Sequence, residues 1–416
     1  MVTRRIFLKD GGLAVLGMGT VPSFLFRTAM AASPTGRKKV LVTIFQRGGA
    51  DGLNIVVPFA EKDYYTHRPS IAIAAPSEKD QASALDLDGF FGLHPALRPL
   101  LPIYKEGHLA IFPAAGSPDP SRSHFDAQDY MESGAPGNKL VGDGWLNRYL
   151  DANRDPEETA FRGLAVGETM PRSLKGTAPA VALKSVEGFG LDVNKNNRST
   201  RSIYESLYSN ETNSLLSGTA QEMFEAIDLL KKENPGQYQP ADGINYGPDN
   251  QNYSFGASLR QVAQLIKADV GLEVACVDIG GWDNHSNETF ELQQVLRVFG
   301  QGLAAFYQDL GDRMEDVVVL TMSEFGRTTR ENGSAGTDHG HANVMFAMGG
   351  PVKGGKIYGS WPGLAPEELN EDRDLALTTD FRDLFGEMLV GHLGCQNPQG
   401  IFPDFTIDAK RFQGII

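Results

Sequence analysis

Four runs of apolar residues, rich in β-branched side chains, each end in a cluster of polar residues. They span Lys38–Gln46, His108–Ala114, Leu272–Asp278 and Asp316–Met322. Each run has the length of a buried strand, and the Gly, Pro, Ser or acidic residues that follow are typical of a strand end. We therefore predict four buried strands whose ends carry polar groups.

Segments with helical periodicity lie between and beyond these strands, at 123–132, 219–231, 258–268 and 288–315. Strands that alternate with helices favour a mostly parallel central sheet covered on both faces, which is a three-layer α/β sandwich. Ligands of such folds gather beyond the carboxyl ends of the strands. We expect one α/β domain over 38–416, with a loop-rich insertion at about 186–256 where Asn, Ser, Gly and Pro are frequent.

The first residues have the pattern of a twin-arginine export signal. The segment Thr3–Lys9 reads TRRIFLK, an apolar stretch covers 11–26, and the small residues Ala29–Ala32 follow. We predict a signal peptide at 1–31 that is read by the twin-arginine export machinery, which places the folded protein in the periplasm or outside the cell. An ordinary secretory signal or an N-terminal anchor is the alternative. The stretch is short and rich in Gly, so no stable membrane anchor is expected after cleavage.

Charge narrows the range of partners. The formal net charge is −14, and removal of four basic residues and one acid with the signal takes it to −17. Nucleic acid binding requires clustered Lys and Arg, so nucleic acid is not an expected partner. The two cysteines, Cys276 and Cys395, form no CxxC or haem-attachment pattern, and the sequence leaves their redox state open.

Two compact polar clusters supply candidate metal ligands. They are GGWDNH at 280–285 and GTDHGH at 336–341, and Asp51 and Glu324 also follow predicted strands. Carboxylates and neutral imidazoles are the usual ligands of Zn²⁺ and Mn²⁺, and turns at strand ends can converge them. The same residue types also cap helices and fill turns. Asp278 is an alternative to Asp283 as the acid of the first cluster.

A candidate nucleophile lies in the segment SRSHFD at 121–126, between a predicted strand and a predicted helix. The hydroxyl of Ser123 would lie at the carboxyl edge of the sheet, near a helix N-terminus that favours anions. The alternative is simple capping of the helix by Ser123, with Asp126 completing a partial capping box. Arg122 and Arg327 are each able to bind an anionic oxygen.

Taken together, the segments GGADGLN, RSHFDAQ, GGWDNH, SEFGRT and GTDHGHAN resemble domain-of-unknown-function family 1501. The likeness runs from about residue 38 to the C-terminus. That family is similar to the alkaline phosphatase and sulfatase superfamily, so the resemblance implies an alkaline-phosphatase-like fold. It also implies one or two divalent metal ions (Zn, Mn, Mg or Ca) at the carboxyl edge of the sheet.

The resemblance also implies roles for individual residues. Those expected to bind metal are Asp51, Asp283, His285, Glu324, His339 and His341, and those expected to act in catalysis are Ser123, His124 and Arg327. Ser123 would be the nucleophile, and His124 or Asp338 would orient a ligand or carry a proton.

The preferred hypothesis is an exported, metal-dependent hydrolase of phosphate or sulfate esters that acts on a small anionic ester. The rival is a non-catalytic periplasmic binding protein that contains a metal on the same fold. An exported redox enzyme is a third hypothesis, which only the signal suggests, because no haem, iron–sulfur or dinucleotide motif accompanies it.

Overall fold

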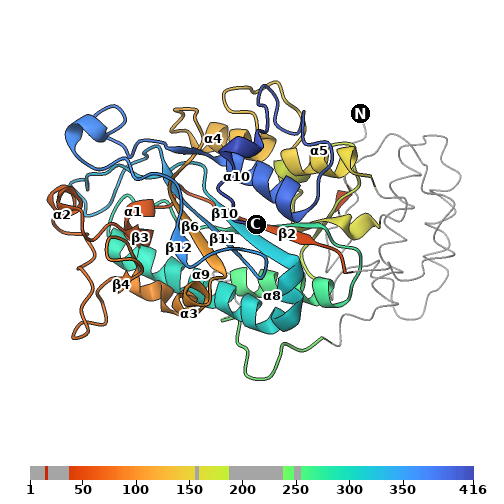
Figure 1. Ribbon diagram of the computed structural model, residues 1–416, viewed down its shortest axis with the longest axis horizontal. Helices are drawn as coiled ribbons and strands as arrows, with labels where there is room; N and C mark the ends of the chain where they lie inside the picture. The colour runs from red at the N-terminus through yellow and green to blue at the C-terminus, as the bar shows by residue number, and fades with distance from the viewer. Residues whose placement is uncertain (1–14, 17–36, 155–158, 187–237, 248–253) are drawn as a thin grey trace, which may run out of the picture.

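The computed structural model describes residues 15–16, 37–154, 159–186, 238–247 and 254–416 (Figure 1). The predicted helix at 219–231, most of the predicted insertion and nearly all of the predicted signal peptide lie outside these ranges. For those segments the sequence-based expectations stay predictions.

A large central sheet organises the described residues. Its strand order is β1-β8-β7-β9-β2-β10-β11-β6-β12, and β13 also pairs with β6. The strands are β1 (Val15–Leu16), β2 (Val40–Gln46), β6 (Leu109–Gly116), β7 (Gly163–Val166), β8 (Val181–Leu183), β9 (Val274–Ile279), β10 (Val317–Met322), β11 (Asn343–Gly349), β12 (Lys356–Ile357) and β13 (Thr379–Asp380). The four predicted strands are β2, β6, β9 and β10, all of which are confirmed.

Most neighbouring strands of this sheet are parallel. The run from β8 through β7, β9 and β2 to β10 is parallel throughout, with Val42 of β2 beside Ala275 of β9 and Val319 of β10. β11 pairs antiparallel with both β10 and β6, and β1 pairs antiparallel with β8. The carboxyl ends of β9, β2 and β10 therefore meet at one edge, which brings together the loops that follow them.

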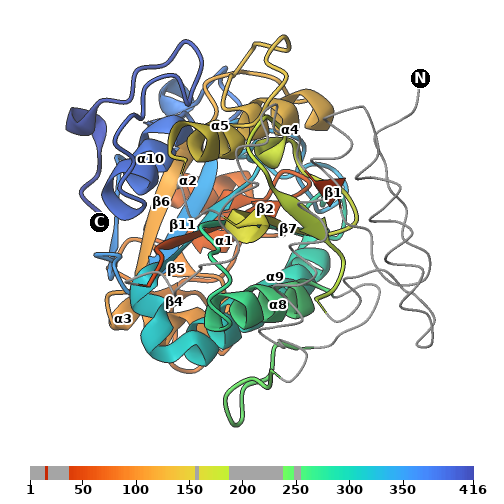
Figure 2. The same ribbon diagram turned by 90° about the vertical axis from the view of Figure 1, so that its right-hand side faces the viewer.

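Helices cover both faces of the sheet, as Figure 2 shows. One layer contains α4 (His124–Ser133), α5 (Trp145–Ala152) and α10 (Phe381–Glu387), and the other contains α8 (Phe255–Lys267), α9 (Glu288–Leu310) and α3 (Leu101–Lys105). The alternation along β2 explains this arrangement: Val40, Val42 and Ile44 pack toward α8 and α9, and Leu41 and Phe45 pack toward the opposite layer. The predicted three-layer α/β sandwich with a mostly parallel sheet is confirmed.

The predicted helices α4 and α8 lie where the sequence places them. The helix predicted at 288–315 is α9, which ends at Leu310, five residues earlier than expected. Gly311 follows with φ +51°, and a 3₁₀ turn over Gly311–Asp316 leads into β10. Glycine ends the helix there because it adopts positive φ at little cost.

Smaller elements lie between β2 and β6. A second sheet has the order β3-β5-β4, from β3 (Val56–Val57), β4 (Leu85–Asp86) and β5 (Gly92–Leu93). It is accompanied by α1 (Gly52–Ile55), α2 (Lys62–His67) and a 3₁₀ helix over Pro95–Leu100. Other 3₁₀ helices span Ala160–Arg162, Arg172–Leu174, Pro366–Glu368 and Ala409–Arg411, and Met388–His392 forms a π-helical turn after α10.

Two further observations concern the whole described part of the chain. None of its helices is long and apolar enough to cross a membrane. Cys276 and Cys395 are both buried and do not bond to each other; burial raises the pKa of the Cys276 thiol to about 12, which keeps it protonated and unreactive.

His94 makes the fold sensitive to acid. Its ring is buried, and its Nδ1 atom accepts a hydrogen bond from the backbone N–H of Ala96 (3.0 Å), which caps the 3₁₀ helix at Pro95–Leu100. A protonated imidazole has no lone pair for this bond. Burial lowers the pKa of His94 to about 4, below the 6.5 expected of an unfolded chain.

We expect His94 to lower the free energy of unfolding as the pH falls from about 6.5 to 4. Over this range its imidazole binds a proton in the unfolded state but not in the folded state. At pH 5 its contribution lowers the free energy of unfolding by about 2 kcal/mol relative to pH 7. Chemical denaturation of wild type and His94→Asn at both pH values measures it, since Asn keeps a capping acceptor but does not titrate. Equal pH dependence in the two proteins would contradict the prediction.

Candidate metal centre

A buried arginine joins the loops at the carboxyl edge of the sheet. The guanidinium of Arg327 has no exposed surface. It donates to the carbonyls of Gly48 (2.5 Å), Gly49 (2.5 Å), Trp282 (3.0 Å) and Thr337 (3.1 Å). Its charge is balanced by Asp283, at 2.6 Å. All of its nitrogens are engaged, so in this geometry Arg327 organises the loops and has no donor left for a substrate.

Asp283, which Arg327 anchors, lies at the centre of three imidazoles. Its Oδ1 is 3.0 Å from Nε2 of His285 and 3.2 Å from Nε2 of His339, and its Oδ2 is 3.4 Å from Nε2 of His124. Nε2 of His285 and Nε2 of His339 are 3.0 Å apart. The sequence predicted Asp283, His285 and His339 as ligands, and the structure brings them together. It adds His124, which the sequence assigned to catalysis.

The other ring nitrogen of each histidine faces an acceptor. Nδ1 of His124 lies 2.8 Å from the carboxylate of Glu324, Nδ1 of His285 lies 3.1 Å from Asp338, and Nδ1 of His339 lies 2.9 Å from the carbonyl of Arg122. An acceptor at Nδ1 favours the neutral tautomer with its proton there, which leaves the Nε2 lone pair able to bind a cation. Three Nε2 atoms therefore point at one place beside a carboxylate, and Nε2 of His285 also lies 3.5 Å from a terminal nitrogen of Arg327.

This arrangement fits a cation. Nε2 of His124 is buried and has no hydrogen-bond partner among the described residues. Two bare nitrogens at 3.0 Å repel each other unless a proton or a cation lies between them. Two ligands of a single ion, each about 2.0–2.1 Å from it, are about 3.0–3.4 Å apart, which is the spacing of the contacts made by Asp283. The ligand atoms of His124, Asp283 and His339 all lie within 4.8 Å of one another, close enough to hold one ion. Nε2 of His285 lies 3.0 Å from both Asp283 and His339.

Electrostatics of the cluster follow from these contacts. The hydrogen bond that His124 donates to Glu324 raises the pKa of His124, and burial lowers the pKa of His339. Burial acts to raise the pKa of Asp283, but Arg327 outweighs it and holds that pKa below its usual range. Asp283 is therefore an anion at neutral pH and able to bind a cation.

Glu324 lies behind His124. Its carboxylate is fully buried and accepts from His124, from Gln128 (2.8 Å) and from the backbone N–H of Gly48 (2.9 Å), and Ser323 donates to its second oxygen (2.9 Å). Both oxygens are thus occupied by protein donors. The geometry makes Glu324 a partner that orients His124; its predicted role as a direct ligand stays a prediction.

Asp51 lies apart from the cluster, in a buried ion pair. Both of its oxygens accept from Arg68 (2.5 and 2.8 Å), and both side chains are buried. Burial acts to raise the pKa of Asp51, and Arg68 holds it down. Burial and the charge of Asp51 raise the pKa of the adjacent Glu288 well above its usual range.

The remaining predicted residues do not join the imidazoles. Ser123 is exposed and caps α4, its hydroxyl accepting from the N–H of Asp126 (3.5 Å). No contact joins the ring of His341 to the cluster in the part of the chain that the structure describes, and the charges nearest to it are those of Asp374 and Arg122. Asp278, the alternative to Asp283, pairs instead with Arg47 at 3.0 Å.

Glycines allow the loops to approach each other. A Cβ atom on Gly336 would lie 2.4 Å from the carbonyl carbon of His285, and one on Gly340 would lie 2.3 Å from that of Arg327. Only residues without a Cβ atom fit at these two positions. The GTDHG motif therefore places His339 by bringing its backbone against both neighbouring loops.

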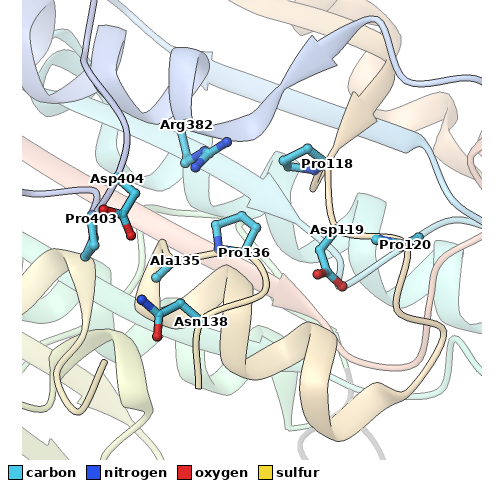
Figure 3. Close-up of a pocket in the computed structure, with 9 residues that line it drawn as sticks. All are labelled: Pro118, Asp119, Pro120, Ala135, Pro136, Asn138, Arg382, Pro403 and Asp404. Carbon is cyan, nitrogen blue, oxygen red and sulfur yellow. The ribbon is translucent and has the colours of Figure 1, made fainter. Parts of the chain in front are cut away.

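A pocket of about 300 Å³ lies beside α4 (Figure 3). Its lining residues are Pro118, Asp119, Pro120, Ala135, Pro136, Asn138, Arg382, Pro403 and Asp404. One wall, Pro118–Pro120, precedes Ser121–Ser123 and His124 directly in the chain. Asp119 accepts from the N–H of Ser121 (2.9 Å). This bond fixes the segment that connects the pocket to His124 and the other imidazoles around Asp283.

The family model described as "Protein of unknown function (DUF1501)" matches residues 111–399. The matched segment contains all four residues of the cluster and the greater part of the sheet. The chain belongs to the DUF1501 family. No curated protein matches it.

Solved structures with a similar fold include sulfatases and phosphatases. A 2-O GAG sulfatase, BT1596, is 12% identical with a TM-score of 0.38, over 92% of this chain and 75% of that one. Alkaline phosphatase from the Antarctic bacterium TAB5 is 10% identical with a TM-score of 0.32, over 76% and 93%. A phosphonate monoester hydrolase from Silicibacter pomeroyi is 9% identical with a TM-score of 0.34, over 91% and 77%.

Replacement of the buried arginine tests its organising role in this DUF1501 protein. We expect Arg327→Met to lower the free energy of unfolding by about 3–5 kcal/mol, because it leaves Asp283 and four carbonyls without their donor. Urea denaturation measures the change, and Arg330→Met, at an exposed position, is the control with an expected change of about 0.5 kcal/mol or less. An unchanged free energy of unfolding in Arg327→Met would contradict the organising role.

Proposed function

We propose that this protein is an exported, metal-dependent hydrolase of phosphate or sulfate esters. The observation that carries the proposal is the convergence of three Nε2 atoms and the carboxylate of Asp283, with the Nε2 atom of His124 buried and unpartnered within the described residues. Export by the twin-arginine route, which the N-terminal sequence predicts, would place it in the periplasm or outside the cell.

The donor set favours one class of metal. Three neutral imidazoles and one carboxylate suit Zn²⁺ or another first-row transition ion better than Mg²⁺ or Ca²⁺, which prefer oxygen ligands. His124, His285, His339 and Asp283 would hold the ion. When bound, such an ion makes an oxygen nucleophile more acidic and stabilises the negative charge that develops on the transferred group.

The residues of this chain would prepare the site for that chemistry. Glu324 keeps the proton of His124 on Nδ1 and thereby directs the Nε2 lone pair into the cluster. Ser123, which precedes His124, would supply the attacking hydroxyl at the N-terminus of α4, where the helix dipole favours an anionic ester. Asp283 and His285 are about half exposed, so a substrate has access to the cluster.

We propose that the chain holds one ion. A second ion beside Asp51 would compete with Arg68, whose guanidinium is bound to both oxygens of that carboxylate. The pocket beside α4 would receive the part of the substrate that does not react, because its wall continues directly into the segment before His124.

Metal content is the first test. We expect about one equivalent of Zn²⁺ or Mn²⁺ in the exported protein by elemental mass spectrometry, and loss of most of it in the double variant His285→Ala/His339→Ala. His67→Ala, at a buried histidine outside the cluster, is the control and should keep its metal. A metal-free, fully stable wild-type protein would rule out the proposed function.

Replacements of Ser123 separate a hydrolase from a non-catalytic metal protein. Asn keeps the helix cap but lacks the hydroxyl, and Thr keeps both. If Ser123 is the nucleophile, we expect Ser123→Asn to lower kcat for aryl phosphate or aryl sulfate esters by about 1,000-fold or more, with Ser123→Thr less affected.

Equal kcat values for wild type and Ser123→Asn would exclude Ser123 as the nucleophile. Absence of turnover in metal-loaded wild type would favour the rival, a metal-containing periplasmic binding protein. Two observations support that rival: the hydroxyl of Ser123 is engaged as a cap, and every nitrogen of Arg327 is engaged within the protein.

A further inference from the structure

The loop of residues 370–374, which lies outside the metal cluster, contacts His339 from two sides. Arg373 donates to the carbonyl of His339 (3.0 Å). Asp374 accepts from Nε and from a terminal nitrogen of Arg122 (3.2 and 2.5 Å), and the carbonyl of Arg122 lies 2.9 Å from Nδ1 of His339. A ligand histidine and a carboxylate are thus joined through the backbone of a third residue.

Burial sets the strength of this connection. Asp374 has no exposed side-chain surface, whereas Glu371, the other partner of Arg122 at 2.6 Å, is more than half exposed. Arg122 is about one-third exposed, so solvent screens its pair with the fully buried Asp374 less than its pair with the exposed Glu371. Asp374, rather than Glu371, therefore fixes Arg122.

The backbone around Asp374 is held in an unfavourable conformation. Glu371 and Asp372 both have φ of +54°, a left-handed region that costs energy for residues with a Cβ atom. Hydrogen bonds on both sides maintain the turn: Asn370 and Asp374 pair with each other, and Thr329 bonds to the carbonyl of Arg373 through its N–H and its hydroxyl. Such strain persists where neighbouring contacts fix the chain.

We propose that Asp374 is a positioning residue for the metal centre. Through Arg122 it holds the carbonyl that keeps the His339 proton on Nδ1, and it fixes the segment that leads to His124 two residues later. The proposal rests on the metal site of the proposed function. It adds Asp374, whose link to His339 runs through the backbone of Arg122.

The test has two readouts. One is the Zn²⁺ affinity, measured by competition with a chelating dye, and the other is the tautomer of His339. We expect Asp374→Asn and Arg122→Ala each to weaken Zn²⁺ binding about 10- to 100-fold, as loss of an outer partner of a ligand histidine does. The double variant Asp374→Asn/Arg122→Ala should bind Zn²⁺ with the same affinity as the single variant that binds it less tightly, because both changes break the same connection. Glu371→Gln should change affinity by about 2-fold or less.

Asp309→Asn is the matched control, since Asp309 is also a buried carboxylate with a cationic partner, Lys267 at 2.7 Å. It lies near the far end of α9, 21 positions beyond Glu288 at the start of that helix. It should leave Zn²⁺ affinity unchanged even if stability falls. A general loss of stability would lower affinity in this variant as well as in Asp374→Asn.

The metal-free proteins give an independent readout. Long-range ¹H–¹⁵N spectra, with the His339 signals assigned by their loss in His339→Gln, should show the proton on Nδ1 in wild type and a mixture of tautomers in Asp374→Asn. An unchanged tautomer together with unchanged affinity would overturn the proposal. A wild type that binds no Zn²⁺ would overturn the proposed function instead, and the spectra would still decide the role of Asp374.

Discussion

The candidate site depends on the burial of one guanidinium. Arg327 has no access to water, so each of its donors must find an acceptor within the protein. The carbonyls of Gly48 and Gly49 come from the loop after β2, that of Trp282 from the loop after β9, and that of Thr337 from the loop before β11. Because β9, β2 and β10 are adjacent parallel strands and the chain turns from β10 into the antiparallel β11 at the same edge, one side chain fixes all three loops. Asp283, the counter-charge, is placed by the same contact.

The imidazoles around Asp283 are oriented by a second set of contacts. Each Nδ1 atom faces an acceptor from a different part of the chain: Glu324 after β10, Asp338 in the loop before β11, and a backbone carbonyl in the segment before α4. The rings are thus oriented before any ion binds, which lowers the conformational entropy lost on binding. In the proposed function the same design would make metal binding sensitive to acid, because an ion would compete with protons for the Nε2 atoms.

The sequence predicts the parts of this arrangement that are local. Continuous apolar runs predicted β2, β9 and β10, and the compact GGWDNH and GTDHGH motifs predicted Asp283, His285 and His339. The Arg68 partner of Asp51 lies in a segment with no motif, and the carbonyl of Arg122 is a backbone group that carries no sequence signal. His124 was placed next to the site, but its pairing with Glu324 depends on a fold that brings together residues 200 positions apart. Pairwise contacts of this kind require the structure.

The Asp51–Arg68 pair explains why the same sheet edge supports a single ion in the proposed mechanism. Arg68 donates to both oxygens of Asp51 and to the carbonyls of Thr328 and Thr329. Glu288 lies beside this pair, and burial together with the charge of Asp51 raises its pKa. An ion that displaced Arg68 would leave a buried guanidinium without its counter-charge, which is strongly unfavourable. The guanidinium therefore takes the place that a second cation would need, and in the proposed mechanism a divalent ion would be confined to the imidazoles around Asp283.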